Sequence, residues 1–108
     1  MRLYHNPRCS KSRQAVAFLI DAGIEFEEYR YLNEGIDSND LELLSNIPNI
    51  LRIKDVVGEY SFDDLDSASI QQILNEQPKS LERPVLIHDG HAILGRPPER
   101  ILEYLNNQ

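Results

Sequence analysis

One short segment near the N-terminus constrains this chain more than any other. It reads Tyr4-His5-Asn6-Pro7-Arg8-Cys9-Ser10-Lys11-Ser12-Arg13 and contains the only cysteine. Apolar residues precede it, and a helix is expected from about residue 11. Pro7 cannot donate a hydrogen bond to a strand ladder, so the strand should end before it. The segment therefore predicts a strand, a loop that carries the thiol, and a helix.

The cysteine is surrounded by positive charge in an otherwise acidic chain. Arg2, Arg8, Lys11 and Arg13 all precede the first acidic residue, Asp21, although the formal net charge is -7. Nearby cations and a helix N-terminus lower a thiol pKa from roughly 8.5 to between about 3.5 and 7.5. The free N–H groups of a helix start also attract anions. We therefore favour a reactive thiolate beside an anion site over a buried, inert thiol.

Length and composition set broad limits on the molecule. With 108 residues, of which 41% are hydrophobic, the chain is expected to form a single domain over residues 1–108. It has no apolar run long enough for a membrane span and no visible secretory signal. One cysteine cannot form an internal disulfide, which favours the cytoplasm. The acidic charge argues against a nucleic-acid partner. No feature fixes an oligomeric state, and a monomer is favoured.

Hydrophobic periodicity and turn residues predict an alternating arrangement of strands and helices. Strands are expected at 2–5, 25–30, 85–88 and 91–94, and helices at 11–22, 39–45, 68–75 and 97–105. The second strand is expected to continue through Tyr31. Ser38 and Ser67 are the expected helix caps, with a further helical turn from Asn49 to Ile53.

The connections between these elements predict the fold. The first two strands should be parallel because a helix joins them, whereas Asp89-Gly90 predicts a tight hairpin between the last two. This order is typical of a thioredoxin-like α/β fold with a four-stranded mixed sheet. The N-terminal βαβ part and the C-terminal ββα part are separated by a helical insert at about 36–80.

Four motifs in this order resemble the glutaredoxin-dependent arsenate reductase (ArsC) family, especially its short single-domain branch. They are the cysteine segment, Leu51-Arg52, Glu82-Arg83-Pro84-Val85 and Gly95-Arg96-Pro97-Pro98-Glu99. The likeness extends over nearly the whole chain.

The resemblance implies a role for particular residues. Cys9 would be the nucleophile that attacks arsenate, with His5 helping to set its thiolate. Arg52, Arg83 and Arg96 would bind the oxyanion, which suits the planar, permanently charged guanidinium group. A cis bond before Pro84 would turn the backbone near Arg83 toward the thiol.

Some of these side chains also have a purely structural interpretation. His5 could instead be a hydrogen-bonded histidine at a strand edge. Ser10 and Ser12 could donate to an anion in the loop or simply cap the helix. His88 and His91 flank the hairpin turn, and there we favour no metal site.

The resemblance further implies reduction of arsenate to arsenite, and thus arsenic detoxification. Glutathione would be the co-substrate and glutaredoxin the reductant, with no bound cofactor and no metal. An enzyme with a single cysteine must take its second thiol from a partner, which agrees with this scheme.

Three other functions are alternatives to glutaredoxin-dependent arsenate reduction. Cys9-Ser10-Lys11-Ser12 has the C-x-x-S form of a monothiol glutaredoxin, but the Arg-Pro motifs and the insert speak against it. A regulator of the same fold that binds RNA polymerase typically has C-x-x-C, and Ser12 stands at its second cysteine. A phosphatase-like arsenate reductase needs C-x5-R, which Ala15 excludes.

Overall fold

A four-stranded mixed sheet forms the centre of the molecule, as predicted. The computed structural model describes residues 1–108. Its strands are β1 (Arg2–Tyr4), β2 (Glu27–Tyr29), β3 (Val85–His88) and β4 (His91–Leu94), in the order β2-β1-β3-β4. β1 is parallel to β2 and antiparallel to β3, which forms the predicted hairpin with β4.

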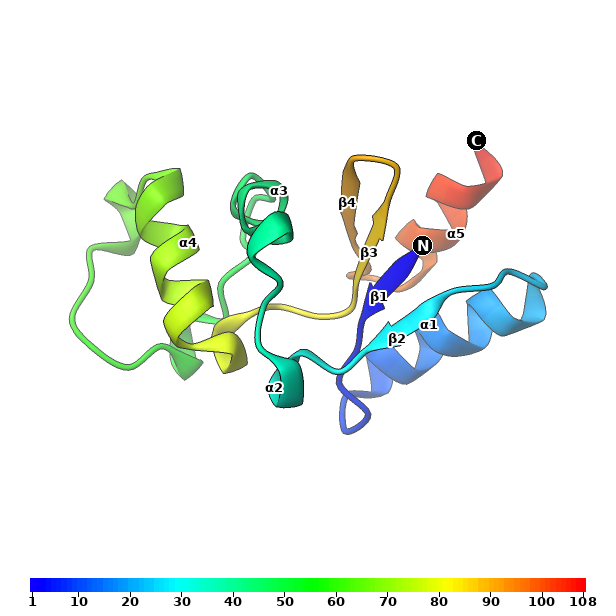
Figure 1. Cartoon of the computed structure of the whole chain (residues 1–108), viewed down its shortest axis with the longest axis horizontal. Coiled ribbons are helices and arrows are strands. Elements are labelled where there is room, and N and C mark those ends of the chain that lie inside the picture. The colour runs from blue at the N-terminus through cyan, green and yellow to red at the C-terminus, as the bar shows by residue number, and fades with distance from the viewer.

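Helices α1 (Ser10–Asp21) and α5 (Glu99–Asn106) pack together beside the sheet (Figure 1). Successive strand residues point to opposite faces, so Leu3 of β1 and its partner Leu86 of β3 face these helices. They form a core with buried residues of the two helices, Ala15, Leu19 and Ile101. Ile20 of α1 lies outside this core and is 63% exposed.

The helical insert packs against the other face of β1 and β3. It begins earlier than the predicted residue 36, with α2 (Tyr31–Glu34), and continues with α3 (Leu41–Ser45), α4 (Ser67–Glu76) and four short 3₁₀ turns. Tyr4 and Val85, which pair across β1 and β3, pack here with Leu44, Leu74 and other buried residues of the insert. In Figure 1, α4 lies at the end of the molecule opposite α1, and α3 lies between α4 and the β3–β4 hairpin. No helix is both long and apolar enough to cross a membrane.

The predicted continuation of the second strand through Tyr31 is wrong. The ladder ends where the His5 N–H donates to the Tyr29 carbonyl, because the segment after β1 then turns into the Asn6-Pro7 loop. The following backbone must satisfy its own polar groups. Gly35 N–H donates to the Tyr31 carbonyl at 2.8 Å, which closes the helical turn α2.

Both predicted serine caps are also wrong, because an aspartate one residue earlier caps each helical segment. Asp37 accepts a hydrogen bond from the Asn39 N–H at 2.9 Å, and Asp66 accepts one from the Ser69 N–H at 2.8 Å. Aspartate is as good a cap as serine, and its charge also suits the positive end of a helix. Ser67 instead shares a 2.7 Å hydrogen bond with Ser45.

The helical turn expected from Asn49 to Ile53 begins only at Ile53. Asn49 has a positive φ of 61°, and Leu51 forms a β-bridge with Leu81. The bridge is fixed by bonds from Arg52 N–H to the Ser80 carbonyl and from Glu82 N–H to the Ile50 carbonyl, both 2.7 Å. It brings Arg52 beside the segment that leads into β3.

Candidate active site at the start of helix α1

Cys9 is the N-cap residue of α1, and its thiol is half-buried. Its backbone is extended, its N–H donates to the Asn6 carbonyl, and its own carbonyl accepts the Arg13 N–H, both at 3.0 Å. Burial raises the thiol pKa. The backbone N–H groups of Ser12 and Lys11 and the Arg83 side chain together outweigh that effect, so the pKa is lowered from its ordinary value.

Ser12 holds the cysteine loop in shape. It is fully buried, and its hydroxyl accepts the Asn6 N–H at 3.0 Å while lying 2.7 Å from His5 Nδ1. The Ser12 side chain therefore neither caps the helix nor faces an open anion site. Ser10, the first residue of the helix, is exposed.

Both ring nitrogens of His5 face protein atoms. Nδ1 contacts Ser12, and Nε2 lies 3.4 Å from a carboxylate oxygen of Glu28. Burial lowers the pKa of the imidazole more than Glu28 raises it. These contacts are those of a structural histidine at a strand end, and they connect His5 to the cysteine loop through Ser12.

Arg83 is the predicted arginine that acts directly on Cys9. Its guanidinium lowers the pKa of the Cys9 thiol, while its Nε is buried with no hydrogen-bond partner. The Arg83–Pro84 peptide bond is cis, in line with the family resemblance, and Arg96–Pro97 is cis as well.

Glu82, which directly precedes Arg83 in the sequence, lies between the side chains of Arg52 and Arg96. Glu82 Oε1 lies 3.0 Å from Arg52 Nη1 and 3.8 Å from Arg96 Nη1. Arg96 also donates to the Arg83 carbonyl at 3.0 Å, and Arg52 Nε contacts Asp55 at 2.7 Å. Glu82 belongs to one of the four sequence motifs, and its place directly before Arg83 is the signal from which this role could have been predicted.

Tyr31 also belongs to this site, although sequence reasoning placed it in a strand. The residue is fully buried, and its hydroxyl has no hydrogen-bond partner. Burial raises the hydroxyl pKa, and the charges of Arg83 and Arg52 lower it, while a Cys9 thiolate raises it further. The Tyr31 hydroxyl is therefore close enough to Cys9, Arg52 and Arg83 for their charges to shift its pKa.

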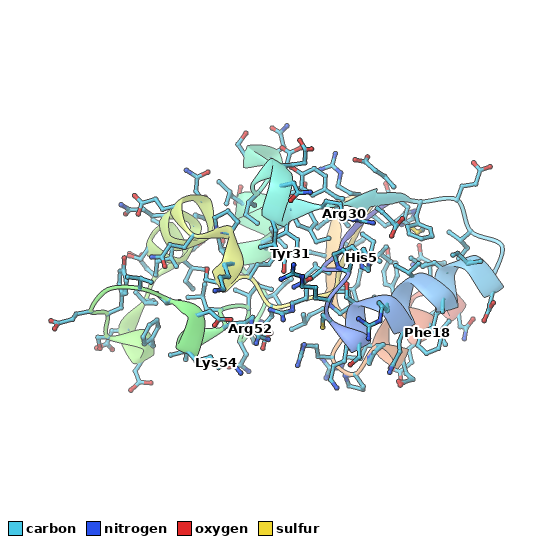
Figure 2. The ribbon with its side chains drawn as sticks, turned by 90° about the horizontal axis from the view of Figure 1, so that it is seen from below. His5, Phe18, Arg30, Tyr31, Arg52 and Lys54 are labelled. Carbon is cyan, nitrogen blue, oxygen red and sulfur yellow. The ribbon has the colours of Figure 1, made fainter.

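A cleft of about 440 Å³ opens beside the cysteine loop. Its lining includes His5, Asn6, Tyr31 and Arg83, with Arg8 and Arg30 among its further cations. Figure 2 shows His5, Arg30, Tyr31 and Arg52 near the middle of the molecule, where the helical insert meets the sheet. Cys9 itself is not part of the lining, but its loop neighbours Pro7 and Arg8 are, so a small anion could bind among these cations next to the cysteine loop.

The fold and this site define a thioredoxin-like protein with one activated thiol beside arginine side chains. The chain belongs to the ArsC family, whose sequence model matches residues 4–104. This confirms the family and the fold that the four motifs predicted.

Several known proteins are similar to this chain over nearly its full length. It is 37% identical to the uncharacterized protein YfgD of Escherichia coli, over 95% of this chain and 94% of that one. It is 34% identical to an arsenate reductase of Neisseria meningitidis, over 94% of each. The solved structure of an arsenate reductase from Vibrio cholerae has a TM-score of 0.74 at 32% identity, covering 95% of this chain and 97% of that one.

A more distant relative has a different name. The chain is 28% identical to the global transcriptional regulator Spx 1 of Lactococcus lactis, over 95% of this chain and 87% of that protein.

Proposed function

We propose that this protein reduces arsenate to arsenite, with Cys9 as the nucleophile and with glutathione and glutaredoxin as the source of electrons. One observation carries the proposal: the half-buried Cys9 thiol stands at the N-cap of helix α1, and the Arg83 side chain lowers the pKa of this thiol. Family membership and the arsenate reductases among the relatives support arsenate as the substrate.

In the proposed cycle, the Cys9 sulfur attacks arsenic and displaces water, which forms an S–As(V) bond. A glutathione thiol then adds to arsenic with loss of a second water. Attack by a glutaredoxin thiol on the glutathione sulfur leaves the bonding electron pair on arsenic. Arsenic becomes As(III), the two external thiols leave as a mixed disulfide, and hydrolysis of the S–As bond releases arsenite and restores Cys9.

The protein side chains have separate tasks in this cycle. The N–H groups of Ser12 and Lys11 and the Arg83 guanidinium lower the pKa of Cys9, which favours the thiolate that attacks arsenic. Arg83 also faces the charge that develops on the arsenate oxygens, where fixed donors are most effective. Arg52 and Arg96 would add positive charge after loosening their contacts with Glu82. His5 acts through Ser12 as a positioning residue.

A coupled assay tests the proposal. The protein is mixed with arsenate, glutathione, glutaredoxin, glutathione reductase and NADPH, and NADPH oxidation is followed. We expect arsenate-dependent turnover that disappears in Cys9→Ser. Ala17→Ser, on the exposed face of the same helix, is the matched control and should keep wild-type activity. No arsenate-dependent turnover by the wild type, or equal turnover by Cys9→Ser, would refute the proposal.

The similarity to Spx 1 supports one alternative, a transcriptional regulator of the same fold. A dithiol switch of the C-x-x-C type cannot form here, because Ser12 stands at the second position and is bonded to the loop. Binding to purified RNA polymerase without arsenate turnover would favour the regulator.

A further inference from the structure

Two buried side-chain atoms of this protein have no hydrogen-bond partner: Tyr31 Oη and Arg83 Nε. Both residues line the cleft beside the cysteine loop. A buried donor without a partner costs free energy, and nearly all buried polar atoms in proteins are paired. Two unpaired donors in one place point to a ligand that brings acceptor oxygens.

Nearby protein groups do not satisfy the Tyr31 hydroxyl. The Asn6 side chain lowers the pKa of this hydroxyl but makes no hydrogen bond with it, and the Asn6 oxygen accepts the Arg8 N–H at 3.0 Å. Arg52, whose charge also lowers the pKa of Tyr31, is engaged with Asp55 and Glu82.

The tyrosine is also held firmly in place. Tyr31 begins α2, its carbonyl accepts the Gly35 N–H, and its ring lies 6.1 Å from that of Tyr4 in the core. Burial keeps its pKa raised despite the two nearby arginines, so the hydroxyl retains its proton when Cys9 is a thiolate. A fixed, protonated hydroxyl is a preorganised donor.

We propose that the Tyr31 hydroxyl donates a hydrogen bond to an oxygen of a tetrahedral oxyanion bound at Cys9, beside the Nε–H of Arg83. The inference rests on the proposed function and deepens it, since the ligand is arsenate or an anion of the same shape and charge. A neutral donor recognises a protonated or unprotonated oxygen without adding charge to a site that already has several arginines.

The test uses Tyr31→Phe, which removes only the hydroxyl oxygen. The alkylation rate of Cys9 by iodoacetamide is measured at increasing arsenate concentration, and the protection gives a Kd for arsenate. Loss of one hydrogen bond should weaken this Kd about tenfold. The pH profile of alkylation without arsenate should stay unchanged, because the hydroxyl makes no hydrogen bond with the sulfur.

Tyr29→Phe is the matched control. It makes the same chemical change two residues away, on a hydroxyl that donates to the Gly35 carbonyl at 2.9 Å. Its Kd for arsenate should equal that of the wild type. An unchanged Kd in Tyr31→Phe, or equal weakening in both variants, overturns the proposal.

Binding and turnover are read separately, so the two proposals can fail separately. If arsenate protects wild-type Cys9 but no NADPH is oxidised, the reductase proposal fails and the Kd values still decide the role of Tyr31. If arsenate gives no protection at any concentration, both fail. Should Tyr31→Phe not fold, a crystal structure of the wild type with arsenate decides: an arsenate oxygen about 3 Å from Tyr31 Oη supports the proposal, and its absence there overturns it.

Discussion

Tyr4 and Tyr31 are packed against each other in one core, yet their hydroxyls have opposite environments. Both residues are fully buried, with ring centroids 6.1 Å apart. The Tyr4 hydroxyl donates to Asp40 at 2.6 Å and accepts the Asp37 N–H at 3.2 Å. The Tyr31 hydroxyl has no partner. Burial alone therefore does not decide whether a polar group is satisfied.

The two tyrosines belong to two different polar regions. Tyr4 lies in a paired cluster, made of Arg2, Tyr4, Asp37 and Asp40, in which Arg2 contacts the two carboxylates at 3.1 and 2.7 Å. This cluster ties β1 to the start of the helical insert. Tyr31 lies in the cysteine site with Cys9 and Arg83, where buried donors are left unpaired.

The paired cluster around Tyr4 contributes to stability, whereas the unpaired donors of the cysteine site point to function. Polar groups that only hold the fold together are satisfied within the protein, because each unpaired buried group costs about 1–3 kcal/mol. Exceptions are expected at functional sites, where the ligand completes the set of hydrogen bonds. Substitutions in the two regions should therefore act on different observables.

The largest effect is expected for Arg83 in the cysteine site. Arg83→Ala removes a donor to the proposed oxyanion, and loss of such a donor costs about 100-fold or more in rate. It also removes a group that lowers the Cys9 pKa, so that pKa should rise and alkylation at neutral pH should slow. The coupled assay and the pH dependence of alkylation measure the two effects.

Arg83→Lys is the control for this prediction. It retains the charge but loses the planar guanidinium, so activity should fall while the thiol pKa changes less than in Arg83→Ala. A thiol pKa that Arg83→Ala leaves unchanged would contradict the assigned role.

Asp40 should have the largest effect in the paired cluster. Asp40→Ala leaves Arg2 and the Tyr4 hydroxyl without their main acceptor, and breaking a buried ion pair in this way costs about 3 kcal/mol. Urea denaturation should show the lower free energy of unfolding, with little change in the reactivity of Cys9. A strong effect on alkylation and none on stability would reverse the distinction between the regions.

The two tyrosines themselves give the most direct comparison. Tyr4→Phe removes a hydroxyl that donates to a carboxylate, so the free energy of unfolding should fall by about 2 kcal/mol. Tyr31→Phe removes an unpaired hydroxyl from the core, and stability should stay the same or rise slightly. Thermal and urea unfolding of both variants in the absence of anion test this pair, and equal losses would show that the two hydroxyls do not differ.

His5 should produce the smallest effect, and it depends on pH. Burial lowers its pKa in the folded protein, so the unfolded chain binds a proton more readily. The contribution of His5 to stability is therefore complete above its unfolded pKa of about 6.5 and declines as the pH falls below it, by at most about 1.4 kcal/mol per pH unit. Urea unfolding at several pH values should show a weaker acid dependence in His5→Gln than in the wild type. The exposed His91 provides the control variant His91→Gln, and an identical pH dependence in His5→Gln and the wild type would refute the prediction.

Much of the fold could be predicted from local patterns. The Asp89-Gly90 hairpin, the position of α1 and the apolar residues of α4 follow from turn chemistry and periodicity, which depend on neighbouring residues. Tyr31 was misplaced because the end of β2 depends on where its partner strand ends. The caps at Asp37 and Asp66 were missed because two adjacent residues were equally suitable.

The sequence by itself determined the chemistry available to this protein: one thiol at a helix start, motif arginines spread along the chain, and membership of the ArsC family. Only the tertiary structure decided how these groups meet. The Leu51–Leu81 bridge brings Arg52 to Glu82, and the turn after β2 brings Tyr31 to Cys9 and Arg83. Contacts of this kind depend on backbone pairing and core packing between distant segments, which no local sequence pattern specifies.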